Sequence, residues 1–328
     1  MQSSALLATA PAEPAPLARL LQQDRAQVQT ALARVDLRLR DFQTVTRLPA
    51  LRYLLTCWTG VAVLAWLWQL LPDYWWVLLI LPLGILQHAL LNIVHEASHY
   101  SLLPDRRWND RVADLLAALP IGHTVASYRL THNDHHLYLR TARDPSSYVT
   151  RPDLTNGDIR RTLLFLLGGR LVWELLARSL LGRRLEAEAA AEPALMKATD
   201  RQRLLAVAGW QLAALALALL LGLQWFWLTW LLVVMTVTPV LDGLRTIVEH
   251  RAGSGESVGT AWHTRSHHRH WLVSALMAPF FQYHWEHHLF PGLPHHQLAA
   301  LHRTLLTLDV AGSRPDSGGF FGTLVRLV

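Results

Sequence analysis

The chain has 328 residues, of which 52% are hydrophobic and 16% are charged. Soluble domains carry about 25% charged residues, so this composition excludes a disordered chain and argues against an ordinary soluble enzyme. The net charge of +6 comes with 18 histidines. A basic excess beside long apolar runs indicates a membrane surface rather than nucleic acid as the partner. The one cysteine, Cys57, excludes a disulfide framework and a zinc site made of cysteines.

Four apolar stretches predict membrane-spanning helices, because a helix needs about 20 apolar residues to cross the hydrocarbon core. In chain order they cover residues 51–71, 75–94, 204–223 and 226–248. Short turns join the first stretch to the second and the third to the fourth. We therefore predict an all-α integral membrane protein whose four transmembrane helices form two hairpins. The predicted domains are an N-terminal segment at 1–48, a membrane domain at 49–310 and a C-terminal tail at 311–328.

The basic residues predict the orientation in the membrane. They lie before or at the start of the first span, between the second and third spans, and from Arg245 onward, whereas the two short turns contain none. Because loops rich in basic residues stay in the cytoplasm, both termini and a helical cap should lie on the cytoplasmic side, in a bacterium at the cytoplasmic membrane. The stretch 162–181 carries Arg170, Glu174 and Arg178 on one face and predicts an interfacial helix.

Nine histidines occur in four groups on the predicted cytoplasmic side. They are His95 and His99 in HEASH, His132, His135 and His136 in HNDHH, His250, and His284, His287 and His288 in HWEHH. Residues three or four apart share one helix face, whereas adjacent residues point about 100° apart, so one box can serve two metals. Nine imidazoles exceed the needs of one four-coordinate zinc and match two metals with four or five ligands each. Imidazole alone does not choose among zinc, copper, iron and nickel.

Acidic residues accompany these histidines and could orient the rings. Glu96, Asp134, Glu249 and Glu286 lie within or beside the groups. Each could accept the N–H of a ring that binds metal through its other nitrogen. We predict this role for Glu96 and Glu249, and a solvated charge or a local arginine pair is the alternative for all four.

The other nine histidines are interpreted as polar residues outside the metal site. They are His88, His123, His302, the loop cluster of His263, His267, His268 and His270, and the pair His295 and His296. His88 lies seven residues before His95 and so shares its helix face. The role of the loop cluster stays open.

The boxes and their surroundings resemble the membrane fatty-acid desaturase superfamily of non-haem di-iron proteins. Besides the boxes, the matching stretches are residues 128–131, Asp144 with Pro145, residues 245–249 and residues 289–291. The resemblance covers about residues 60–305. It implies that the nine boxed histidines, His250 included, bind two iron ions, and that O₂ is the co-substrate.

By this resemblance the protein would be an oxidoreductase that removes two hydrogens from an aliphatic chain of a lipid, which enters from the bilayer. Electrons would come from a separate donor such as a ferredoxin. A hydroxylase or ketolase of the same superfamily, acting on a carotenoid or lipid, is the alternative. A non-enzymatic metal or haem-binding membrane protein is a more distant one, because transport favours ionisable residues along the middle of the spans. Candidates for the substrate tunnel or its roof, or for ordinary packing, are Trp262, Trp271, Phe280, Phe281, Tyr283 and Trp285.

Overall fold

The structure is a computed structural model, and it describes residues 15–72, 74–139, 141, 143–151, 153–168, 194–251, 264–267, 281–310 and 319–328. These residues form helices and turns, and no strand occurs among them. The predicted all-α class is therefore confirmed for the described part of the chain. Residues 169–181 of the predicted interfacial helix lie outside the described residues.

Four segments are long and apolar enough to cross a membrane, as the sequence predicted. They are Leu39–Leu70, Trp75–Ser98, Arg201–Leu220 and Gln224–His250. In the second and fourth segments, 56% and 50% of the most apolar window is buried inside the protein, against 6% in the third. The second and fourth segments therefore form the interior of the bundle, whereas the third presents its side chains outward.

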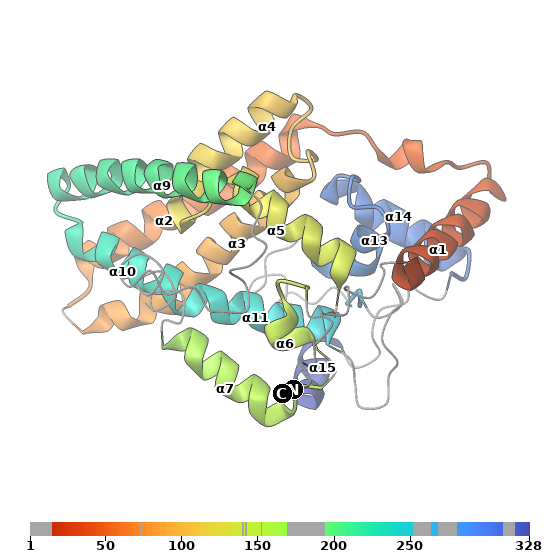
Figure 1. Cartoon of the computed structure of the whole chain (residues 1–328). Helices are drawn as coiled ribbons and strands as arrows, with labels where there is room; N and C mark the ends of the chain where they lie inside the picture. Colours follow the sequence, from red (N-terminus) through yellow and green to blue (C-terminus); the bar gives the residue numbers. More distant parts are fainter. Residues whose placement is uncertain are drawn as a thin grey trace, which may run out of the picture.

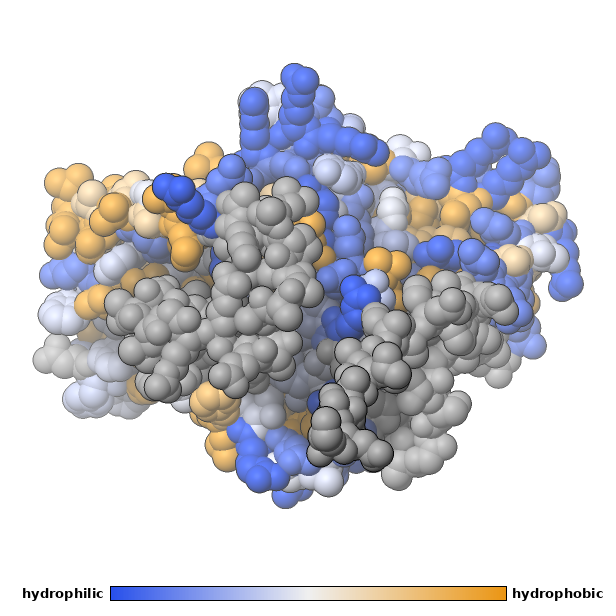
Figure 2. Space-filling model, viewed as in Figure 1, coloured by the Kyte–Doolittle hydropathy of each residue, from blue (hydrophilic) through white to orange (hydrophobic). Residues whose placement is uncertain are grey.

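The helices of these segments are α2 (Arg47–Leu70), α3 (Ile80–Ser98), α9 (Ala194–Leu220), α10 (Gln224–Met235) and α11 (Val237–His250). Helix α2 packs on α3, α9 on α10, and α3 on both α10 and α11 (Figure 1). On the face shown in Figure 2, hydrophobic residues gather over α9. Such a surface suits lipid rather than water.

The fourth segment breaks at Thr236, which separates α10 from α11. Pro239 explains the break, because its ring clashes with the carbonyl four residues earlier, on Met235, and its nitrogen cannot donate to it. Helices α3 and α11 approach each other closely at Gly84 of α3. A Cβ atom added to Gly84 would lie 2.7 Å from Cγ1 of Val237, so the absence of a side chain lets these helices meet.

The remaining α-helices surround the end of the bundle at which α3 and α11 finish (Figure 1). They are α1 (Ala15–Ala33), α4 (Arg106–Ala113), α5 (Val125–Tyr138), α6 (Ser147–Thr150), α7 (Asn156–Leu167), α13 (His284–Leu289), α14 (His295–Thr307) and α15 (Gly319–Leu327). Short 3₁₀ or π turns cover Leu39–Phe42, Trp75–Leu79, Asp114–Ala118, Leu119–Ile121 and Phe281–Tyr283.

A second apolar core holds α13 in place beside the bundle. Trp285 and Leu289 of α13 pack with Leu298 and Leu301 of α14 and with Leu32 of α1, and all five are almost fully buried. At the other side, α15 packs on α11, so part of the predicted C-terminal tail is an ordered helix. The third histidine box is thus fixed by tertiary packing, since a helix of six residues is not stable alone.

Candidate metal centre

The structure brings all nine boxed histidines together where four helices meet. Helix α3 ends at the first box, α5 carries the second, α11 ends at His250, and α13 carries the third. Seven of the nine side chains are buried, and those of His99 and His136 are half-buried. The ring nitrogens therefore come together from distant parts of the sequence. His95 and His288, the first and last of the nine, are 193 residues apart.

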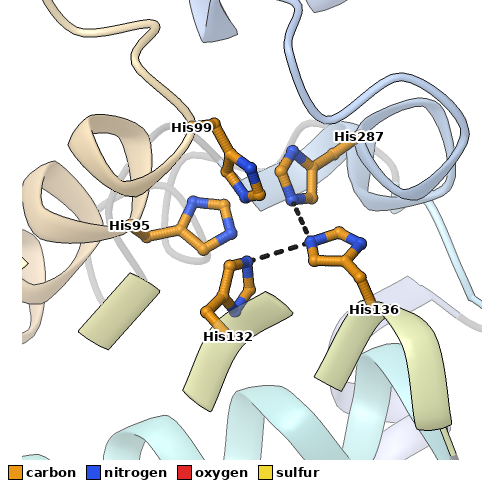
Figure 3. Close-up of side chains that lie close together, drawn as sticks. All are labelled: His95, His99, His132, His136 and His287. Carbon is orange, nitrogen blue, oxygen red and sulfur yellow. Dashed lines mark hydrogen bonds between the residues drawn. The ribbon is translucent and has the colours of Figure 1, made fainter. Parts of the chain in front are cut away.

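The first set of these residues is the five-histidine group. It consists of His95, His99, His132, His136 and His287, whose possible ligand nitrogens all lie within 4.8 Å of one another. Figure 3 shows the five rings pointing toward a common centre. Nε2 of His136 lies 3.0 Å from Nε2 of His132 and 3.2 Å from Nε2 of His287. Helices α3, α5 and α13 thus contribute to one site.

The second set is the four-histidine group, which consists of His135, His250, His284 and His288. Ring nitrogens of His135, His250 and His288 lie within 4.8 Å of one another. A ring nitrogen of His284 likewise lies within 4.8 Å of a ring nitrogen of His250 and of a carboxylate oxygen of Glu249. Nε2 of His250 lies 3.1 Å from Nε2 of His135 and 2.7 Å from Nε2 of His284. The four-histidine group thus takes a ligand from α11, whereas the five-histidine group takes its ligands from α3, and both groups also use α5 and α13.

The helical spacing explains how each box is divided. His132 and His136 are four residues apart on α5 and enter the same group, whereas the adjacent His135 points into the other group. His287 and His288 divide in the same manner on α13. His95 and His99 both enter the five-histidine group, as expected for one ion held by residues four apart.

The donor set fits a metal better than it fits hydrogen bonds among the rings. A ring nitrogen carries either one N–H or one lone pair in its plane, yet Nε2 of His136 and Nε2 of His250 each face two other ring nitrogens. Nitrogens about 2.0–2.1 Å from a shared metal and at right angles around it lie about 2.9 Å apart. The four observed separations span 2.7–3.2 Å. Nε2 of His99 and of His288 are also buried without a hydrogen-bond partner among the described residues.

Burial keeps these imidazoles in the form that binds metal. The pKa of His99 is lowered to about 3, first by burial and then by the nearby charge of Arg129. Burial, followed by neighbouring histidines, lowers the pKa of His132, His136, His287 and His288 well below the usual value. These rings are therefore neutral at pH 7, so a metal need not displace protons from them.

Comparison with known proteins identifies the kind of chain that carries this site. The model of the fatty acid desaturase family matches residues 73–312, which include all nine histidines. The chain belongs to this family. A dihydrorhizobitoxine desaturase of Bradyrhizobium elkanii is 27% identical over 237 residues, which cover 67% of this chain and 65% of that relative. The chain thus matches slightly less than two thirds of the relative's length.

One carboxylate that the sequence analysis did not assign contacts a histidine of this desaturase-family site. Oδ1 of Asp144 lies 2.9 Å from Nδ1 of His135, and its side chain is fully buried. The same carboxylate accepts hydrogen bonds from Ser146 N and Thr150 Oγ1. A negative acceptor at Nδ1 keeps the proton there and leaves Nε2 of His135 free for a metal. In the sequence, Asp144 was noted only because Asp144 and Pro145 match the family. Its contact with His135 could not be inferred from the spacing of the two residues.

The two predicted carboxylates behave differently from one another. Oε2 of Glu249 lies 3.4 Å from Nε2 of His284, which is the nitrogen that faces His250 rather than the distal one. Oε1 of Glu96 accepts a hydrogen bond of 2.8 Å from the backbone N–H of His295. Glu96 therefore contacts the first residue of α14, which lies beside the last turn of α3.

Other predicted residues have structural contacts. His302 Nδ1 lies 2.5 Å from Oε1 of Glu286, and Ser266 Oγ donates to the other oxygen at 2.6 Å. His88 is fully buried, with Nε2 3.8 Å from Asp242. Trp285 packs in the core with α1 and α14. This is the ordinary packing that the sequence analysis gave as the alternative to a place in the substrate tunnel. His263, His268, His270, Trp262, Trp271 and Phe280 lie outside the described residues.

Proposed function

We propose that the protein is a di-iron, O₂-dependent oxidoreductase that desaturates the aliphatic chain of a lipid, with a fatty acyl group as the substrate class. The observation that carries this proposal is the convergence of nine histidines in two groups at the ends of apolar helices. Membership of the fatty acid desaturase family and similarity to a relative named as a desaturase support it. Iron is proposed over other imidazole-binding metals because of the family.

Each group has ligands for one ion. The five-histidine group offers five ring nitrogens, and the four-histidine group offers four. When bound, the irons would supply the oxidant needed to break an unactivated C–H bond, which acid–base side chains cannot do. The balanced reaction takes up O₂, two electrons and two protons and releases two waters with the alkene. The residues of this chain hold the ions, keep the rings neutral and, through their burial, exclude water from the reacting bond.

The proposed topology places this chemistry next to the lipid. The two histidine groups lie beside the ends of α3 and α11, and the basic residues favour the cytoplasmic side for that end and for both termini. Two helical hairpins would then enter the bilayer from the cytoplasm beneath a helical cap. A substrate chain would reach the site from the bilayer, and a separate ferredoxin-like protein would deliver electrons.

Expression in a host of known lipid content, followed by untargeted lipid and pigment profiling, tests the proposal. The wild-type chain should produce lipids that have lost two hydrogens, and the His287→Ala variant should not. A product that has gained oxygen would instead identify a hydroxylase or ketolase. Purified protein that binds no iron, or a His135→Ala variant with full activity, would refute the proposal.

A further inference from the structure

We infer that Glu249 is a direct ligand of the four-histidine group, which makes its metal site a mixed histidine–carboxylate site unlike the five-histidine site. This inference rests on the proposed di-iron function. Glu249 immediately precedes His250 at the end of α11, and its side chain is 2% exposed. A carboxylate oxygen of Glu249 forms a possible metal-binding set with ring nitrogens of His250 and His284, all within 4.8 Å of one another.

The distances around Oε2 of Glu249 suit coordination. It lies 3.4 Å from Nε2 of His284, which in turn lies 2.7 Å from Nε2 of His250. Two ligand atoms that are each about 2.1 Å from one ion are about 2.9 Å apart when they are adjacent and about 4.2 Å apart when they are opposite. Among the described residues, Oε2 has an ion-pair contact of 3.1 Å with Nε of Arg245, and that contact lacks the alignment of a hydrogen bond. A buried carboxylate oxygen in that state has unused capacity to bind a cation.

Charge gives a second reason. Neutral imidazoles bring no charge, so two divalent ions held by nine of them would form a buried, uncompensated charge. Among the described residues, Glu249 contacts a ring nitrogen that faces a metal position in the four-histidine group, whereas Asp144 contacts the distal nitrogen of His135. A carboxylate ligand would bring this group to five ligands, the same number as in the five-histidine group.

Arg245 holds Glu249 close to this position. Its Nε lies 3.1 Å from Oε2 of Glu249, one helical turn along α11. The guanidinium also donates from Nη1 to Asn92 at 2.8 Å, and its Nη2 lies 3.7 Å from Asp242. Arg245 therefore has Asp242 as a second carboxylate partner when Glu249 binds the ion. Glu249 can turn toward the metal without leaving a buried guanidinium unpaired.

Metal analysis and Mössbauer spectroscopy of protein loaded with ⁵⁷Fe test this assignment without using activity. Wild type should hold about two irons per chain, with two distinct ferrous signals from the two unlike sites. Glu249→Ala should lose one signal and retain about one iron. The isosteric Glu249→Gln should weaken iron binding at the same site at least tenfold, and it tests the inference even if Glu249→Ala fails to fold.

Glu96→Gln is the matched control, because Glu96 also adjoins a boxed histidine but bonds to the N–H of His295. It should keep both signals. Two irons with unchanged signals in folded Glu249→Ala or Glu249→Gln would overturn the inference while leaving the proposed function intact. Wild-type protein without iron would refute the proposed function itself, and the inference with it.

Discussion

Asp144→Asn should weaken iron binding at the four-histidine group while the fold is retained. Oδ1 of Asp144 lies 2.9 Å from Nδ1 of His135 and fixes which ring nitrogen carries the proton. The amide has the same shape and can keep the contacts to Ser146 N and Thr150 Oγ1, but it loses the negative charge. Removing such a partner lowers metal affinity about 10–100-fold, or about 1.4–2.7 kcal/mol. The five-histidine group, which does not include His135, should keep its affinity.

The measurement is anaerobic titration of metal-free protein with Fe²⁺ against a competing chelator, which resolves the two affinities. Thr150→Val is the control, because it removes the hydrogen bond to Oδ2 of Asp144 and leaves Oδ1 beside His135. It should lower thermal stability slightly and leave both iron affinities unchanged. Equal iron affinities in wild type and Asp144→Asn, or an equal loss in Thr150→Val, would show that the contact with His135 does not tune the site.

Three further outcomes follow from the same geometry. His99→Ala and His288→Ala should each leave about one iron per chain by metal analysis, because they belong to different groups, and loss of both irons from either variant would contradict two separate sites. Glu286→Gln should lower the free energy of unfolding by about 1.5–3 kcal/mol, because it weakens the buried contacts to His302 and Ser266, and thermal unfolding in detergent measures this. Metal-free protein should lose stability as the pH falls below about 6.5, by up to about 1.4 kcal/mol per pH unit for each buried ring. The reason is that histidines of the unfolded chain bind protons in this range, whereas His99 in the folded protein, with a pKa of about 3, stays neutral. Denaturation between pH 7.5 and 4.5 checks this, and constant stability would count against neutral rings.

The membrane helices and the division of a histidine box between two metals could be predicted because both depend on local periodicity. A run of about 20 apolar residues indicates a span whatever surrounds it. The spacing within HNDHH and HWEHH predicted that the two adjacent histidines of each box point to different metals, as His135 with His136 and His287 with His288 do. It did not predict which of the two would join the first histidine of the box, because both lie within one helical turn of it.

The carboxylate contacts could not be predicted in this way, because tertiary packing decides them. Asp144 reaches His135 only because the chain turns back after α5. Glu96 directly follows His95 and Glu249 directly precedes His250, so each carboxylate adjoins a boxed histidine on its own helix. The position of the first residue of α14 beside α3 nevertheless lets Glu96 accept a hydrogen bond from His295, which is 199 residues away. Sequence proximity to a ligand therefore did not indicate which group each carboxylate contacts.

The separation of the two groups depends on how α3 and α11 pack, because the groups share α5 and α13 and differ in these two spans. Two buried polar contacts connect the spans inside the apolar bundle. Nη1 of Arg245 donates to Asn92 at 2.8 Å, and Thr238 Oγ1 donates to Gln87 at 2.7 Å. Polar side chains are costly in a membrane interior unless they are paired, so a sliding of α11 along α3 would break both contacts at once. These contacts therefore hold the register that places His95 and His250 beside the same two helices.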